Sequence, residues 1–108
     1  MTKRLPPRAV LFRRDAERAR LELAAATFEV TAVFTRLAAL ATAGEMTTLI
    51  APAKPYDLRE TPAAAALLAT LHEEGFRTAW EPISGLPGVP AHHGLRIDWS
   101  PAPLPIRG

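Results

Sequence analysis

The sequence contains no cysteine among its 108 residues. A disulfide framework and a zinc site built from thiolates are therefore both excluded, and the fold must be held together by packing alone. Aromatic residues make up only 6% of the chain, although 48% of it is hydrophobic. A chain of this length and apolar content can form one small core, so we predict a single domain.

Long apolar runs are also missing. The longest nearly uninterrupted run, from Leu37 to Ala43, is much shorter than the roughly 20 residues that a helix needs to cross a bilayer. The basic start of the chain holds Pro6, Pro7 and Arg8 and leads into no apolar stretch of secretory length. We expect a cytoplasmic protein with no signal peptide and no membrane partner.

No catalytic or metal-binding pattern stands out. His92 and His93 are neighbours in a stretch rich in Pro and Gly, and adjacent histidines rarely converge on one ion without further ligands. Glu73 and Glu74 are adjacent, so they point in different directions on a helix and do not form a catalytic pair. We predict that the protein is not an enzyme and has no catalytic residues, no metal, no cofactor and no small-molecule substrate.

What the chain does have is an apolar seam at helical spacing. Steps of four and three residues alternate over about 30 residues, which predicts one helix roughly 45 Å long, over residues 9–43. No Gly or Pro interrupts this range, and Gly44 is well placed to end the helix in a left-handed conformation. The segment from Phe28 to Thr35 is partly alternating and could by itself form a strand, but the seam continues through it. The seam consists of Phe12, Ala16, Ala19, Leu23, Ala26, Val30, Val33, Leu37 and Leu40.

The remainder of the chain predicts a β-α-β-β unit over residues 46–100. Residues 46–51 form a short strand, and Thr61 and Pro62 have the chemistry of a helix start. That helix should run to Glu74 and end at Gly75. Alternating apolar and polar residues predict two more strands, 76–81 and 95–100, which pair antiparallel and set arginines against acids on their outer face.

The other face of these two strands carries the large apolar side chains Phe76, Trp80 and Trp99, which we expect in the core. Residues 82–94, which include His92 and His93, are expected to form an exposed excursion.

The predicted fold class is α+β, with a long N-terminal helix followed by the β-α-β-β unit and a small three-stranded mixed sheet. In that sheet the first two strands run parallel through a right-handed crossover, and the third is added antiparallel. We predict an extended basic arm at residues 1–8, a single domain at 9–100 and a Pro-rich tail at 101–108.

Positive charge is concentrated at the start of the chain. Residues 1–20 hold seven basic and two acidic side chains, a net charge of +5, so the other 88 residues sum to −3. Clustered arginines attract phosphate groups, so one hypothesis is a nucleic-acid-binding accessory protein. The other interpretation is that these charged side chains are simply solvated on the first part of a helix. The candidate anion-binding residues are Arg4, Arg8, Arg13, Arg14, Arg18 and Arg20.

The seam has two possible uses: association with a copy of the chain or a partner, and burial within the same molecule. Its flanks are mostly alanine, which is typical of close packing in a bundle or on a sheet. Because a three-stranded sheet needs a helical cover, we expect the half from Ala26 to Leu40 to pack on the strands. The other half should bind a partner, through Phe12, Ala16, Ala19 and Leu23. The chain is then a non-catalytic interaction or assembly module.

Three segments carry a resemblance to a known type of protein. A helix ends in small residues at 37–44, a Leu-rich helix ends at the pair Gly75 and Phe76, and a strand from Leu95 to Trp99 closes the unit. In this order they resemble small accessory and virion proteins of tailed phages. The resemblance implies a structural protein, associated with the virion, that assembles by contacts with itself or with a larger protein assembly.

Overall fold

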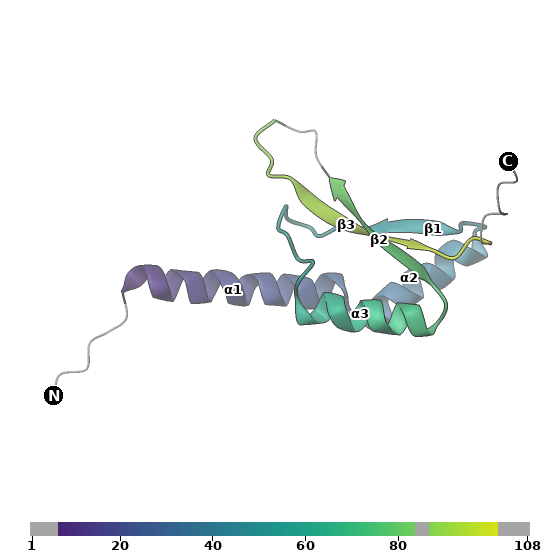
Figure 1. Cartoon of the computed structure of the whole chain (residues 1–108), viewed down its shortest axis with the longest axis horizontal. Helices are drawn as coiled ribbons and strands as arrows, with labels where there is room; N and C mark the ends of the chain where they lie inside the picture. Colours follow the sequence, from purple (N-terminus) through teal and green to yellow (C-terminus); the bar gives the residue numbers. More distant parts are fainter. Residues whose placement is uncertain (1–6, 84–86, 102–108) are drawn as a thin grey trace, which may run out of the picture.

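The computed structural model describes residues 7–83 and 87–101. It contains three helices and three strands in the order helix, helix, strand, helix, strand, strand, which confirms the predicted α+β class (Figure 1). Arg8, assigned to the predicted arm, begins the first helix. Residues 1–6 of that arm and 102–108 of the predicted tail lie outside the described residues. The elements are α1 (Arg8–Thr27), α2 (Val30–Thr42), β1 (Thr47–Ile50), α3 (Pro62–Glu73), β2 (Arg77–Ile83) and β3 (His92–Asp98).

The long N-terminal helix is bent, and the predicted single helix is divided into α1 and α2 at Phe28 and Glu29. Glu29 has an extended backbone, with φ −63° and ψ 123°, and its carboxylate accepts hydrogen bonds from the backbone N–H groups of Thr31 and Ala32. Phe28 is only 2% exposed and packs edge to face on Trp80, with ring centroids 5.8 Å apart. The bend therefore buries Phe28 and gives α2 its own N-cap.

The predicted end of this long helix is confirmed. Gly44 has φ +93°, a conformation that only a residue without Cβ adopts at little cost. The N–H of Glu45 donates to the carbonyl of Leu40 at 2.9 Å, and the N–H of Gly44 donates to that of Ala41 at 3.0 Å. These two bonds form a Schellman motif, which satisfies carbonyls that the helix end would leave unpaired.

Helix α3 begins and ends where its sequence predicts. The Thr61 hydroxyl accepts from the Ala64 N–H at 3.3 Å, and Pro62 occupies the first turn. Gly75 follows the helix with φ +90°. The helix buries Ala64, Leu67 and Leu71 completely, and these lie on one face because they are three or four residues apart.

The three-stranded sheet has the order β1-β3-β2, and both of its pairings are antiparallel. The predicted mixed sheet is therefore not confirmed, although the predicted antiparallel pairing of β2 with β3 is. Strands β1 and β2 run in the same direction, but β3 lies between them. Leu95 and Ile97 of β3 are 0% exposed and belong to the core, and the central strand is paired along both of its edges.

Strands β2 and β3 also extend further than predicted and shorten the connection between them. Pro82 and Ile83 continue β2, while His92 and His93 begin β3. The predicted excursion over 82–94 is therefore wrong at both ends. Pro82 can be accommodated because β2 is an edge strand, where one side of the backbone needs no partner in the sheet.

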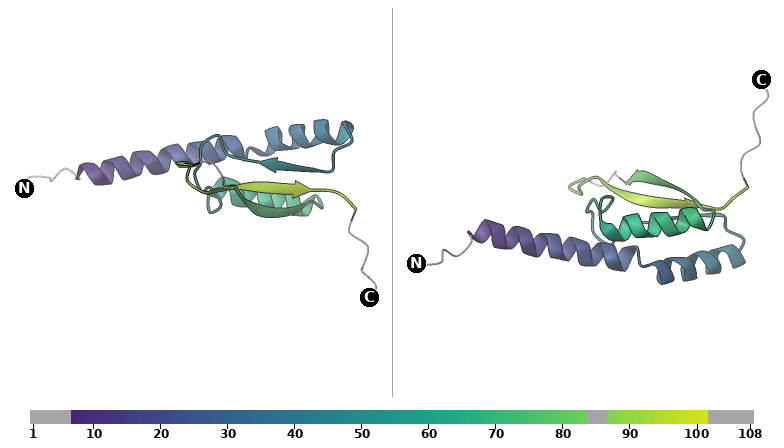
Figure 2. Two further views of the ribbon diagram at one scale, coloured as in Figure 1. Left: turned by 90° about the horizontal axis from the view of Figure 1, so that it is seen from above. Right: turned by 60° about the horizontal axis from the view of Figure 1, so that its bottom comes forward.

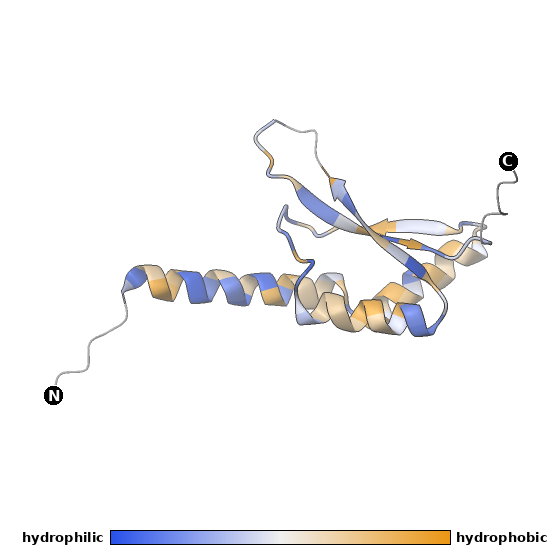
Figure 3. Cartoon of the chain, in the orientation of Figure 1, coloured by the Kyte–Doolittle hydropathy of each residue, from blue (hydrophilic) through white to orange (hydrophobic). Residues whose placement is uncertain are grey.

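The helices cover one face of the sheet, and the core lies between the two layers (Figure 2). Helix α2 lies against β1, where the Arg36 guanidinium approaches the Thr48 hydroxyl at 3.4 Å. Helix α3 packs on β2 and on the end of α1. Apolar residues gather where α2 and α3 meet the sheet, whereas the outer half of α1 is mostly hydrophilic (Figure 3).

Candidate functional site

The N-terminal part of α1 extends away from the rest of the molecule (Figure 1). Every residue from Leu11 to Glu22 is exposed, over a length of about 18 Å at 1.5 Å per residue. Three of these are large and apolar: Leu11 is 41% exposed, Phe12 66% and Leu21 50%. We call Arg8–Glu22 the projecting segment, and it is the first candidate interaction surface.

The structure separates the predicted partner-binding residues into two groups. Phe12, Ala16 and Ala19 are exposed in the projecting segment, whereas Leu23 is half-buried against the core. In the other half of the seam, Val33 and Leu37 are each 3% exposed and belong to the core, while Ala26 is exposed. The boundary between the exposed and packed parts of the long helix thus lies close to Leu23.

The predicted anion-binding arginines are also divided. Arg8, Arg13, Arg14 and Arg18 are exposed, and none of them takes part in an ion pair within residues 7–83 and 87–101. The guanidinium carbon of Arg20 lies 5.0 Å from the centre of the Tyr56 ring, a cation–π contact that fastens α1 to the loop before α3. Arg4 lies outside the described residues.

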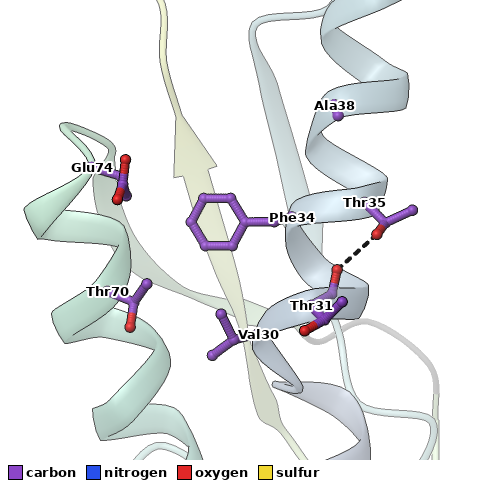
Figure 4. Close-up of a pocket in the computed structure, with 7 residues that line it drawn as sticks. All are labelled: Val30, Thr31, Phe34, Thr35, Ala38, Thr70 and Glu74. Atoms are coloured by element: carbon purple, nitrogen blue, oxygen red, sulfur yellow. Dashed lines mark hydrogen bonds between the residues drawn. The ribbon is translucent and has the colours of Figure 1, made fainter.

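A second candidate surface is an open apolar groove between α2 and α3. Two adjoining hollows of about 640 and 230 Å³ share Phe34 and Ala38. Val30 and Phe34 point from α2 toward α3, and Thr70 and Glu74 lie across from them (Figure 4). We call this surface the aromatic groove. It is lined by Val30, Thr31, Phe34, Thr35, Leu37, Ala38, Ala41, Thr70, Glu74, Phe76 and Trp99.

Three aromatic rings give the groove its shape. Phe34 and Phe76 meet edge to face with centroids 5.7 Å apart, and Phe76 meets Trp99 in the same way at 6.0 Å. The strand alternation indicates that Phe76 and Trp99 lie on the core side of the sheet, but no pattern in the sequence shows that α2 leaves their edges accessible. Phe34 does not belong to the seam, so the seam alone does not detect the groove.

The groove offers almost no polar groups to a ligand. The hydroxyl of Thr35 donates to the Thr31 carbonyl at 2.8 Å, and that of Thr70 donates to the Ala66 carbonyl at 3.1 Å. These threonines therefore use their donors within their own helices. The Glu74 carboxylate is the charged group at the edge of the groove, so the surface is suited to an apolar ligand with at most one positive charge.

Charged side chains on the outer face of the sheet form the predicted pairs between β2 and β3. Arg96 donates to Glu81 at 2.9 Å and lowers the pKa of that carboxyl group. Hydrogen bonds from Ser100, and then the charge of Arg77 at 3.4 Å, lower the pKa of Asp98. These groups are exposed and already paired, so they support the sheet and do not form an acid–base site.

The histidines do not form a common site. His72 Nε2 lies 2.7 Å from the Thr78 hydroxyl, and His92 Nδ1 lies 3.2 Å from the Pro90 carbonyl. The Nδ1 atom of His93 is buried without a hydrogen-bond partner. Within the described part of the chain, no three His, Asp or Glu side chains are grouped closely enough to hold a metal ion.

The bent helix Arg8–Thr42 contains an 18-residue window with a mean hydropathy of 1.5, of which 22% is buried. By length and composition alone this helix could cross a membrane. A core helix of a soluble protein passes the same test, and Glu29 and Arg36 would place charges within a bilayer at considerable cost. The absence of a membrane partner stays a prediction.

Comparison with known proteins adds no functional assignment, because no family model, curated protein or solved structure matches this chain.

Proposed function

We propose that this protein is a non-catalytic interaction or assembly module that binds a second copy of itself or a larger protein assembly through the projecting segment. The observation that carries the proposal is the exposure of Leu11, Phe12 and Leu21 on a helix that extends away from the domain. Fully burying a side chain of this kind contributes roughly 1.5 to 3 kcal/mol. A partner that covers this segment would therefore gain substantial binding energy. Its role in a phage particle stays a prediction that rests on the order of the parts.

The small residues of the segment support the same proposal. Ala16 and Ala19 lie on the same side as Phe12, because residues three and four apart are neighbours on a helix. A helix with alanines at these positions allows a second helix to approach closely, and Phe12 then supplies an anchor. The segment could therefore pack against another helix.

The test is the mass of the protein in solution over a wide concentration range, measured by light scattering after gel filtration. The parent chain should form a larger species as concentration rises, and Phe12→Glu with Leu21→Glu should remove it. Circular dichroism should show the same helix content in both. The matched control is Ala65→Glu with Ala69→Glu, a change of equal charge at exposed positions of α3. Two results together contradict the proposal. The parent stays monomeric at every concentration, and the parent and the variant capture the same proteins from the native assembly.

A second candidate function is nucleic-acid binding through the exposed arginines of the same segment. Arg13, Arg14 and Arg18 lie within two turns of α1 and form no ion pair in the described structure.

The test of this function is the salt dependence of binding. Binding to duplex or single-stranded DNA should weaken steeply with salt. Replacing all three by Ala should reduce the slope of log K against log salt by about 0.9 for each phosphate of duplex DNA that an arginine no longer neutralises. Arg59→Ala, which removes an exposed but paired arginine, is the control. No binding at low salt contradicts this function.

A further inference from the structure

We propose that the partner of the projecting segment is a second copy of this chain, whose aromatic groove receives the side of the segment that carries Phe12. This inference rests on the proposed function, which it deepens by naming the partner and the surface that is bound. Four observations support it: the apolar side of the segment, the lining and length of the groove, the charges of both, and the geometry that separates them within one molecule.

The side of the projecting segment that carries Phe12 is apolar and narrow. Phe12, Ala16 and Ala19 are exposed there, and they share one side because residues three and four apart are neighbours on a helix. Leu21 follows Phe12 by about two and a half turns and therefore lies on the opposite side. The Phe12 side thus combines one large anchor with small residues that let the helix come close to another surface.

The lining of the aromatic groove is complementary to this side. An amphipathic helix can bind by laying its apolar face into a hydrophobic groove. Phe76 meets Phe34 at 5.7 Å and Trp99 at 6.0 Å, both edge to face, so an inserted phenylalanine ring finds aromatic partners. Ala38 lines both hollows of the groove, and its small side chain leaves room for a helix above it.

The groove is also long enough for the segment. It runs along α2 from Val30 to Ala41, which is about 17 Å at 1.5 Å per residue. The stretch from Arg8 to Ala19 in α1 has the same number of residues and therefore the same length. The whole Phe12 side can thus lie along the groove.

The charges of the two surfaces are opposite. The projecting segment holds five arginines and three acidic residues, a net charge of +2. Glu74 is the charged residue of the groove lining and lies across from Phe34 and Ala38 (Figure 4). Arg8, four residues before Phe12, is on the apolar side and brings a positive charge to the groove. Two projecting segments carry the same net charge, so charge favours the groove over a second segment.

Within one molecule the segment and the groove cannot meet. Helix α1 is continuous over Arg8–Thr27 and extends away from the domain, whereas the groove begins at Val30, beyond the bend (Figures 1 and 2). Swinging α1 back about the bend would withdraw Ala24 and Phe28 from the core, where they are 0% and 2% exposed. The contact therefore needs a second copy. Because the two surfaces differ, it can repeat into a closed ring or an open chain.

The test uses two full-length variants that each lose one surface. Phe12→Glu removes the anchor of the segment, and Ala38→Glu places a second negative charge near Glu74 at an exposed position of the groove. In light scattering, each variant alone should need a concentration at least about tenfold higher than the parent to associate. The controls are Leu21→Glu, on the opposite side of α1, and Ala39→Glu, exposed and outside the groove lining. Both should associate like the parent.

An equal mixture of the two variants tests the contact directly. The intact segment of Ala38→Glu can bind the intact groove of Phe12→Glu, and no further contact can follow. The mixture should therefore form a heterodimer and nothing larger, at concentrations where each variant alone is monomeric. Circular dichroism should show the same helix content in both variants and in the parent.

NMR on the same mixture locates the contact. The chain has no cysteine, so Asp15→Cys in the Ala38→Glu variant attaches a single nitroxide label to the projecting segment. In isotope-labelled Phe12→Glu, the backbone N–H signals of Thr35 and Thr70, which line the groove, should broaden. The signal of Glu81, whose side chain lies on the outer face of the sheet, should not.

The outcomes separate this inference from the proposed function. If Phe12→Glu prevents association and Ala38→Glu does not, the segment binds elsewhere, so this inference is overturned while the proposed function stands. A monomeric mixture, or a parent that is monomeric at every concentration, also overturns this inference. If Phe12→Glu and Leu21→Glu, alone and combined, both associate like the parent, the projecting segment is not the binding surface and the proposed function fails as well.

Discussion

Two phenylalanines of the long helix have opposite environments. Phe28 is 2% exposed and contacts Trp80 in the core, whereas Phe12 is 66% exposed in the projecting segment. The cost of removing an aromatic ring depends on its surroundings and on the cavity left behind, and not on the residue type alone. These two positions therefore allow a controlled comparison within one helix.

We predict that Phe28→Ala lowers the free energy of unfolding by about 3 to 5 kcal/mol, because it leaves a cavity beside Trp80. Phe12→Ala should change it by less than about 0.5 kcal/mol in the monomer, since little surface is uncovered. Urea unfolding at low protein concentration measures both. Equal losses of stability in the two variants would show that Phe12 is not free in the folded monomer.

Among the carboxyl groups, Asp57 has the pKa that a neighbouring residue lowers most. Arg59 donates two hydrogen bonds to it, at 2.9 and 2.8 Å, and lowers its pKa from 3.8 to about 2. Because the folded pKa is lower than the ordinary value, the pair stabilises the fold above about pH 4, and this contribution is lost as the pH falls toward 2. Both side chains are at least 40% exposed, so the contribution is only about 0.2 to 1 kcal/mol.

When the pH falls from roughly 5 to roughly 2.5, the free energy of unfolding should decrease less in Asp57→Asn than in the parent chain. Urea unfolding at the two pH values measures the difference. Asp15→Asn, at an exposed position of α1 that forms no ion pair in the described structure, should follow the parent. The same acid dependence in Asp57→Asn and in the parent would contradict the role given to Arg59.

At the scale of elements, the division of the long helix depends on Glu29. Its carboxylate accepts from two backbone N–H groups that the start of α2 would otherwise leave without partners. Aspartate and asparagine are the usual residues at such a position, so the longer glutamate is a weak signal in the sequence. The seam passes through Glu29 without a change of period, and for this reason the sequence predicts one helix where the structure has two.

Glu29→Ala should lower the free energy of unfolding by about 0.5 to 2 kcal/mol, the usual effect of removing an N-cap side chain. Glu22→Ala, an exposed change in α1, should have little effect. Thermal unfolding followed by circular dichroism compares the variants. If Glu29→Ala is as stable as Glu22→Ala, α1 and α2 can form one straight helix at no cost and the cap is not needed.

Other elements follow from short-range chemistry and are predictable. Thr61 with Pro62 marks the start of α3, and Gly44 and Gly75 mark two helix ends, because each of these residues suits the backbone conformation at its position. The alternation in β2 and β3 correctly predicts their antiparallel pairing and the Arg–acid pairs. The order of strands is not local information, since it depends on which strand gains most from being covered on both sides.

At the scale of the whole molecule, the projecting segment adds little to the core of its own domain. Between Leu11 and Glu22 all side chains are exposed, and Arg20, near the end of this range, contacts the Tyr56 ring. An exposed helix held by so few contacts contributes little to the free energy of folding. Its apolar side chains are then available for a partner.

We predict that a chain beginning at Arg20 folds with nearly the same stability as the full chain, within about 1 kcal/mol, and no longer shows the association proposed for the projecting segment. Urea unfolding and light scattering together test this prediction. A chain beginning at Leu23, which also lacks the Arg20 side chain, should be less stable by a further 0.5 to 1 kcal/mol, approximately the value of an exposed cation–π pair. A large loss of stability in the chain beginning at Arg20 would mean that the segment belongs to the fold.

The sequence by itself determines the α+β class, the start of α3, the helix ends at Gly44 and Gly75, the pairing of β2 with β3 and the exposed position of the basic, Phe12-containing half of the long helix. These features depend on residue type and spacing over a few turns or along one strand. The tertiary structure decides the bend at Phe28, the central place of β3 and the aromatic groove. Each of these depends on how separate elements share a limited apolar core, and the accessible edges of Phe34, Phe76 and Trp99 exist only after α2, α3 and the sheet have packed together.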